Sequence, residues 1–230
     1  MSENTVIDAL FNAGAHIGYG RPRRHASVRS QLFGAKNGVD IIDLTKTAKQ
    51  LEAASAAVRE LGKQGKTVLF VGAKKEIADL VVDAATIVSM PYVASRWLGG
   101  TLTNFVEIKK RIARMKNLTE QFAKGDLVQK YTKKERLMLE RELTRLKADF
   151  GGIAALESLP AAVVVVDARA EEIAVTEAIK LRIPVIALAN TDNDISKIAF
   201  PVLANDSARE SVKYFLDTVA TSLKAGIAQK

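Results

Sequence analysis

The sequence predicts a doubly wound α/β fold, in which helices cover both faces of a mostly parallel sheet. Short, unbroken, valine-rich runs recur along the chain, and such runs are typical of parallel strands buried on both faces. Segments with apolar residues at helical spacing alternate with these runs, as an α/β fold requires. Residues 103–150 break the alternation with two long amphipathic stretches, which indicates an insertion into the sheet domain.

Five apolar runs are expected to form the strands. Consecutive residues in each run are apolar, so neither face of these strands is expected to meet water. The expected strands lie at 67–72, 91–94, 162–167, 183–189 and 199–203.

Four segments are expected to be helices. The first repeats apolar residues at helical spacing from Ala48 to Leu61, and Gly62 follows as a typical helix end. Glu171 and Glu172 place negative charge at the start of another helix, where the helix dipole favours it. The expected helices lie at 45–61, 74–85, 171–181 and 207–223.

The insertion is expected to be an antiparallel coiled-coil hairpin. Apolar residues recur mostly three and four apart in both halves, and a polar turn containing Gly125 and Asp126 separates them. Two such narrow stripes predict two helices that pack along one seam. The expected organisation is an α/β domain of the Rossmann or flavodoxin kind, formed by 1–102 plus 151–230, and an arm formed by 103–150.

Composition excludes several classes of protein. The 230 residues contain no cysteine, which excludes disulfides and thiolate metal sites and suits a reducing cytoplasm. No apolar run approaches the roughly 20 residues that a membrane-spanning helix needs. The first residues carry two acids and no base, so neither a secretory signal nor a transit peptide is expected. We therefore expect a cytoplasmic protein with no membrane partner.

The charge of the chain favours an anionic partner. The formal net charge is +8, and the excess of basic residues is confined to residues 1–150. No acid lies between Asp8 and Asp40, whereas four arginines and a lysine do. Arginine matches the geometry of phosphate, and unpaired cations repel one another unless an anion is present.

The nucleotide-binding fingerprints of α/β proteins are absent. Gly65-Lys66-Thr67 resembles the end of a phosphate-binding loop, but Glu60 stands where the first glycine is required, and the segment precedes a strand. The loop after the strand at 67–72 contains a single glycine, so a dinucleotide fingerprint is also missing. Lys74 and Lys75 are therefore interpreted as surface cations at a helix start.

Candidate catalytic and metal-binding residues favour structural roles. The chain has no nucleophile elbow, and its two histidines do not suggest a triad. Asp167 follows a strand and is interpreted as a cap, and 192–194 as an acidic surface loop. His16 is expected to be a hydrogen-bonded structural residue, and His25 is a candidate for phosphate contact. We expect no catalytic residue, cofactor, metal or small-molecule substrate.

The segment Ser95–Asn104, S-R-W-L-G-G-T-L-T-N, leaves two interpretations open. The glycines permit a tight turn, and Trp97 would then plug the base of the arm. Alternatively, a phosphate approaches the bare backbone, Arg96 pairs with it, and the indole stacks on an unpaired base. Residue types alone leave the two interpretations balanced.

Several motifs resemble one known family. S-R-W-L-G-G-T-L-T-N before a basic arm, G-A-H-I-G-Y, F-G-A-K-N-G-V-D-I-I-D-L-T-K-T and L-P-A-A-V-V-V-V-D-A-R-A-E-E-I-A-V-T-E-A-I-K-L-R-I-P are similar to the bacterial form of small-subunit ribosomal protein two. The resemblance covers the chain from about Ala9 to Leu223. It implies a non-catalytic structural component of the small ribosomal subunit. The implied partners are small-subunit ribosomal RNA and neighbouring proteins, including the large messenger-binding protein one.

The basic residues are the expected RNA ligands, because they neutralise phosphates without reading sequence. The expected RNA-binding residues are Arg21, Arg23, Arg24, Arg29, Lys36, Arg96, Trp97, Lys109, Lys110, Arg111 and Arg114. Two other classes remain as alternatives. An enzyme acting on sugar phosphates or nucleotides would bind a small phosphate ligand at the strand ends, and a coiled-coil scaffold would bind proteins through 103–150 without RNA.

Overall fold

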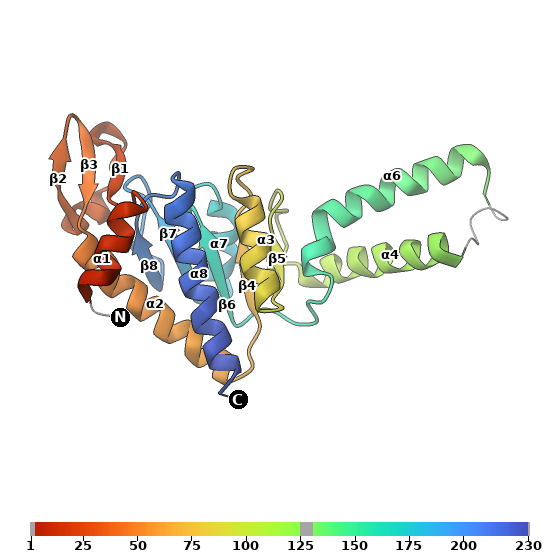
Figure 1. Cartoon of the computed structure of the whole chain (residues 1–230). Coiled ribbons are helices and arrows are strands. Elements are labelled where there is room, and N and C mark those ends of the chain that lie inside the picture. The colour runs from red at the N-terminus through yellow and green to blue at the C-terminus, as the bar shows by residue number, and fades with distance from the viewer. Residues whose placement is uncertain (1–2, 125–130, 230) are drawn as a thin grey trace.

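The computed structural model describes residues 3–124 and 131–229, and the expected turn at Gly125 and Asp126 lies outside them. Its main sheet has five parallel strands in the order β5-β4-β6-β7-β8 (Figure 1). This order is the one found in doubly wound sheets of the flavodoxin kind. All five expected strands are confirmed, as β4 (Val68–Val71), β5 (Tyr92–Val93), β6 (Ala162–Val166), β7 (Val185–Ala189) and β8 (Phe200–Leu203).

Alternate residues of these strands form two separate cores, one on each face. Phe70, Val164 and Ile186 belong to the first core, whereas their neighbours Leu69 and Val163 belong to the second. The first core also contains residues of α2 (Leu44–Lys63), α3 (Ala78–Ile87) and α8 (Arg209–Ile227). The second contains residues of α7 (Glu172–Lys180) and of the arm. The four expected helices are thus present, although α3 begins later than expected.

Helices α2 and α8 approach closely because a glycine of each lies in the contact. A Cβ atom on Gly226 would lie 2.1 Å from the carbonyl oxygen of Arg59, and one on Gly62 would lie 2.6 Å from that of Leu223. Larger residues at these two positions would therefore force the helices apart.

The N-terminal region contains a further helix and a small second sheet. Helix α1 (Glu3–Asn12) comes first, and β1 (Ile17–Gly20), β2 (Leu32–Lys36) and β3 (Val39–Ile42) form an antiparallel sheet in the order β1-β3-β2. Asn37 and Gly38 connect β2 to β3 with φ of 52° and 78°. Asn-Gly is the preferred pair for such a hairpin turn, so the sequence did contain this signal. Figure 1 shows this small sheet at the end of the molecule opposite to the arm.

The arm consists of α4 (Phe105–Lys124) and α6 (Lys133–Phe150), which extend together away from the main sheet (Figure 1). Their buried residues Ile112, Met115 and Leu118 share one apolar cluster with Leu143 and Leu146. Thr132 and Glu135 form a reciprocal capping box at the start of α6. The expected helices are present, while coiled-coil winding and the division at 103–150 stay predictions.

No helix in the described ranges is both long and apolar enough to cross a membrane.

Candidate nucleic-acid interface

The S-R-W-L-G-G-T-L-T-N segment wraps around the carboxylate of Glu177, which comes from α7. Glu177 Oε1 accepts hydrogen bonds from the Gly100 amide at 2.7 Å and from the indole Nε1 of Trp97 at 3.3 Å. Its Oε2 accepts from the amides of Leu102 and Thr103, both at 3.0 Å, and from the Thr103 hydroxyl at 3.1 Å. The segment therefore encloses an internal anion, which accounts for its bare backbone without a phosphate.

This arrangement corrects the expectation for Trp97. The indole is 6% exposed and belongs to the core between the sheet and the arm. A buried ring whose N–H is already bonded to Glu177 is not available to stack on an RNA base. Arg96, in contrast, is exposed and makes no ion pair or hydrogen bond through its side chain within the described ranges.

The hydrogen bonds also set the protonation state of Glu177. Burial alone would raise its pKa, but the donors of Thr103, Gly100, Leu102 and Trp97 outweigh burial and lower the pKa below its ordinary value. The carboxylate is thus charged at neutral pH, and it fixes the connection from β5 into the arm.

Two arginines of the segment between Asp8 and Asp40, which contains no acid, form ion pairs within the protein. The expectation that the arginines of this segment are unpaired is therefore wrong for these two. Arg24 makes a two-pronged ion pair with Asp40, which is fully buried, with Nε 2.7 Å from Oδ2. Arg23 lies over the ring of Tyr19 and donates to Asp192 at 3.0 Å. The acids that neutralise these arginines come from elsewhere in the chain, so sequence proximity did not reveal them.

The other cations of this region are exposed and have no such partner. Arg21, Arg29 and Lys36 make no side-chain hydrogen bond or ion pair in the part of the chain that the structure describes. Arg21 and Lys36 lie near one end of the small sheet, because Gly20 and Lys36 both pair with Val39. Their charge faces solvent, where it can meet an anion at little desolvation cost.

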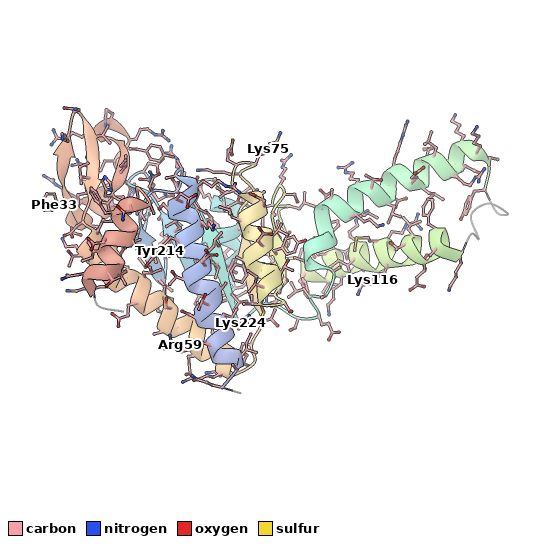
Figure 2. The ribbon with its side chains drawn as sticks, in the orientation of Figure 1. Phe33, Arg59, Lys75, Lys116, Tyr214 and Lys224 are labelled. Carbon is pink, nitrogen blue, oxygen red and sulfur yellow. The ribbon has the colours of Figure 1, made fainter. Side chains whose placement is uncertain are left out.

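An exposed aromatic residue accompanies these cations, although no motif in the sequence marks it as a contact. Phe33 of β2 is 82% exposed, and Figure 2 shows it at the outer side of the small sheet. It follows Leu32 directly, so the side chain alternates away from the partly buried face of the strand. Aromatic faces of this kind stack on unpaired bases.

The cations of the arm are also of two kinds, those that contact another side chain of the arm and those that have no partner in the described part of the chain. Arg114 donates both prongs to Glu142 of α6 at 3.0 and 3.1 Å, and Lys110 pairs with Glu107 at 2.6 Å. Lys109 lies over the ring of Phe105. Arg111 is exposed and has no hydrogen bond or ion pair among the described residues. Lys116 points away from α6, as Figure 2 shows.

Side chains that follow the carboxyl ends of the main strands form ion pairs with one another. Lys74 Nζ lies 2.5 Å from Asp167 Oδ2 and 3.6 Å from Asp206 Oδ2, so Lys74 is not the simple surface cation expected. Burial works against the charge of Lys74, but these carboxylates outweigh burial and raise its pKa. Burial and the charge of Asp167 raise the pKa of Asp206. Asp167 accepts from the amides of Arg169 and Ala170, so it stabilises the turn before α7, whereas the N-cap position of α7 itself is Glu171.

Two further expectations need correction. Asp192 is 9% exposed and pairs with Arg23 and Arg169, so the 192–194 loop is not simply an acidic surface. His16 stacks on Phe11 at a ring separation of 4.5 Å, but its buried Nδ1 has no hydrogen bond in the described structure. Within the described residues, no group of three or more His, Cys, Asp or Glu could hold a metal ion.

These features define a class of protein: a basic α/β protein whose strand ends are closed by internal ion pairs, and whose unpaired cations face outward. Residues 10–226 match the family described as Ribosomal protein S2. A small ribosomal subunit protein uS2 from Fusobacterium nucleatum is 42% identical over 217 residues, covering 94% of this chain and 88% of the relative. Another from Flavobacterium johnsoniae is 36% identical over 230 residues, covering 100% and 90%.

The chain belongs to the ribosomal protein S2 family, as the motifs of the sequence indicated. It is a structural protein of translation and not an enzyme. The expectation of a non-catalytic protein is thereby confirmed, and the enzyme alternative is excluded.

Proposed function

We propose that this protein binds small-subunit ribosomal RNA through its exposed, internally unpaired cations. The observation that carries the proposal is the division among the basic residues. Some are neutralised inside the protein, as Arg24 is by Asp40. Others face solvent without an acid partner in the described structure. RNA phosphates supply the missing negative charge, and release of their counterions provides affinity without sequence reading.

The proposed RNA contacts differ from those expected from sequence. Arg24 and Trp97 serve the fold, and Arg23 and Arg114 have acid partners that compete with phosphate. The exposed contacts are proposed to be Arg21, Arg29, Lys36, Arg96, Lys109 and Arg111, with Phe33 stacking on an unpaired base. Lys110 is set aside because Glu107 already pairs with it. The protein would accordingly reside in the cytoplasm as part of the ribosome.

We further propose that the arm supports docking of the large messenger-binding protein one of the subunit. Large apolar side chains remain exposed on its helices: Val106 is 68% exposed, Met138 61% and Leu137 47%. Exposed apolar side chains beside basic ones favour a protein partner in addition to RNA.

Binding of purified small-subunit ribosomal RNA tests the proposal. The triple variant R21A/R29A/K36A is expected to bind several-fold more weakly than the wild type at a fixed salt concentration. The matched control R59A/K63A/K224A removes the same charge from exposed residues of α2 and α8, and Figure 2 shows Arg59 and Lys224 far from Phe33. Equal loss of affinity in the two variants would remove the small sheet from the interface.

A further inference from the structure

A pocket of about 590 Å³ lies at the carboxyl ends of the strands. Its lining includes Ala73 after β4, Arg96 and Trp97 after β5, and Glu171 after β6. The chain leaves β4 toward β5 on one side and then returns to β6 on the other. Doubly wound sheets bind their ligands at such a reversal, and the volume suits a small organic molecule.

Glu171 is a buried acceptor that the protein only partly satisfies. Its residue is 4% exposed, and Oε1 accepts the amide of Ala73 at 2.8 Å. Oε2 has no hydrogen bond in the described ranges, although the side chain lines the pocket. Burial, reinforced by the charge of Asp167, raises the pKa of Glu171. Because Oε2 belongs to a side chain that lines the pocket and no group in the described structure donates to it, a ligand that offers N–H groups here would supply its hydrogen bonds.

The rest of the lining adds apolar contact and positive charge. Ile173 is 58% exposed, and Ala78 and Ala94 also line the pocket. Lys75 and Arg96 are exposed lining residues with no side-chain partner among those described. Figure 2 shows Lys75 projecting from the edge of the sheet domain. Two free cations suit a phosphate, and the apolar side chains suit the face of a base.

The pocket differs from a dinucleotide site in where the phosphate would lie. Helix α3 begins only at Ala78, and the space that a Cβ atom on Gly72 would need is taken by Val81 at 2.9 Å. The turn after β4 therefore offers no glycine cradle for a pyrophosphate. The positive charge that the lining offers comes from the side chains of Lys75 and Arg96 and not from a helix end.

We propose that this pocket binds one guanosine monophosphate unit, with the base directed toward Glu171 and the phosphate at Lys75 and Arg96. Guanine is favoured because its Watson–Crick edge presents two adjacent N–H donors, which match the two oxygens of a carboxylate. The unit is either an unpaired residue of RNA or a free nucleotide. Only the RNA source rests on the proposed function.

The single tryptophan of the chain provides the assay, because Trp97 lines the pocket. Purified full-length protein is titrated with GMP, AMP, CMP, UMP and inorganic phosphate while indole fluorescence is recorded. We expect a saturable change with GMP, at least tenfold weaker binding of the other nucleotides, and the weakest response to phosphate. The absence of saturable binding by GMP, or equal binding of all four nucleotides, overturns the proposal.

Two variants and a control separate the parts of the pocket. E171Q retains an acceptor for the Ala73 amide but removes the carboxylate, and it is expected to abolish the preference for GMP. The variant K75A/R96A is expected to weaken the binding of all four nucleotides by a similar factor. E172Q changes the next residue, which is exposed and lies outside the pocket lining, and should bind as the wild type does. An E171Q protein that folds, by circular dichroism, and still prefers GMP contradicts the assignment.

The source of the nucleotide and the proposed function are tested in parallel. Saturable quenching by a uridine oligonucleotide with one guanosine, but not by uridine alone, identifies an RNA residue; quenching by GMP alone identifies a free nucleotide. Ribosomal RNA binding is measured for the same variants. If E171Q and the wild type bind that RNA equally and neither binds GMP, the pocket proposal fails while the proposed function stands. Loss of RNA binding in R21A/R29A/K36A does not affect the GMP result.

Discussion

The carboxylate of Glu177 is expected to be among the most sensitive polar groups of the fold. In Glu177→Gln, one oxygen becomes an NH₂ group that cannot accept a hydrogen bond. Each oxygen of Glu177 serves at least two N–H donors, so either orientation of the amide leaves two of them unpaired. An unpaired buried donor costs about 1–3 kcal/mol, which predicts a loss of about 2–6 kcal/mol in the free energy of unfolding.

Thermal unfolding followed by circular dichroism measures this loss. For a protein of this size about 2–4 °C in Tm corresponds to each kcal/mol, so E177Q should unfold at least about 4 °C below the wild type. The control E172Q alters an exposed carboxylate at the start of the same helix and removes at most about 1 kcal/mol of dipole interaction. Equal Tm values for E177Q and E172Q would refute the reasoning.

The difference in stability between the wild type and E177Q should change with pH in a defined direction. Because the folded protein lowers the pKa of Glu177, its carboxylate contributes its full stability above the ordinary glutamate pKa of about 4.3. The contribution is lost as the pH falls through the lower pKa of the folded state. The stability difference between wild type and E177Q should therefore narrow only below about pH 4.3. A difference that disappears at higher pH would contradict the assignment.

Three further changes separate the forces in the molecule. Leu118→Ala, at a fully buried position, should lower the free energy of unfolding of the arm by about 2–5 kcal/mol, whereas Arg114→Ala should lower it by at most about 1 kcal/mol. Hydrogen exchange of the α4 amides measures both losses. A larger loss in Arg114→Ala than in Leu118→Ala would refute the conclusion that apolar packing holds the arm together. Asp40→Asn removes the carboxylate that pairs with Arg24 and should lower the free energy of unfolding in denaturant. An unchanged midpoint would show that the pair is not needed. Met138→Glu should weaken binding of the messenger-binding protein one in a pull-down without changing RNA affinity, and unchanged capture would remove this side chain from the docking surface.

The main sheet was predictable because its strands are buried on both faces. Residues Val163 to Val166 are at most 1% exposed. Because both faces of the strand are buried, the sequence there is continuously apolar, and this pattern predicts a buried strand. The arm was predictable for a related reason, since each of its helices buries a single stripe. Asn37-Gly38 marks the hairpin of the small N-terminal sheet, but the strands on either side are hard to predict because both are short and β2 is mostly exposed.

The candidate site was less predictable, because charge in the sequence does not reveal pairing in space. Arg24 and Arg21 look equivalent in the sequence, yet a carboxylate sixteen residues away neutralises only Arg24. The sequence leaves base stacking by Trp97 open because its partner, Glu177, lies 80 residues away. A residue type can therefore indicate a partner's chemistry, but only the fold decides which cations remain free for it.

The salt dependence of RNA binding tests most directly the claim that free surface cations bind ribosomal RNA. The logarithm of the association constant of the wild type with small-subunit ribosomal RNA should fall linearly with the logarithm of salt concentration. Each cation that contacts phosphate contributes about 0.7–0.9 to the slope, so R21A/R29A/K36A should flatten it by about 2–3. The slope of Arg23→Ala, whose guanidinium is paired with Asp192, should change less than that of Arg21→Ala. An identical slope for the triple variant and the wild type would contradict the account.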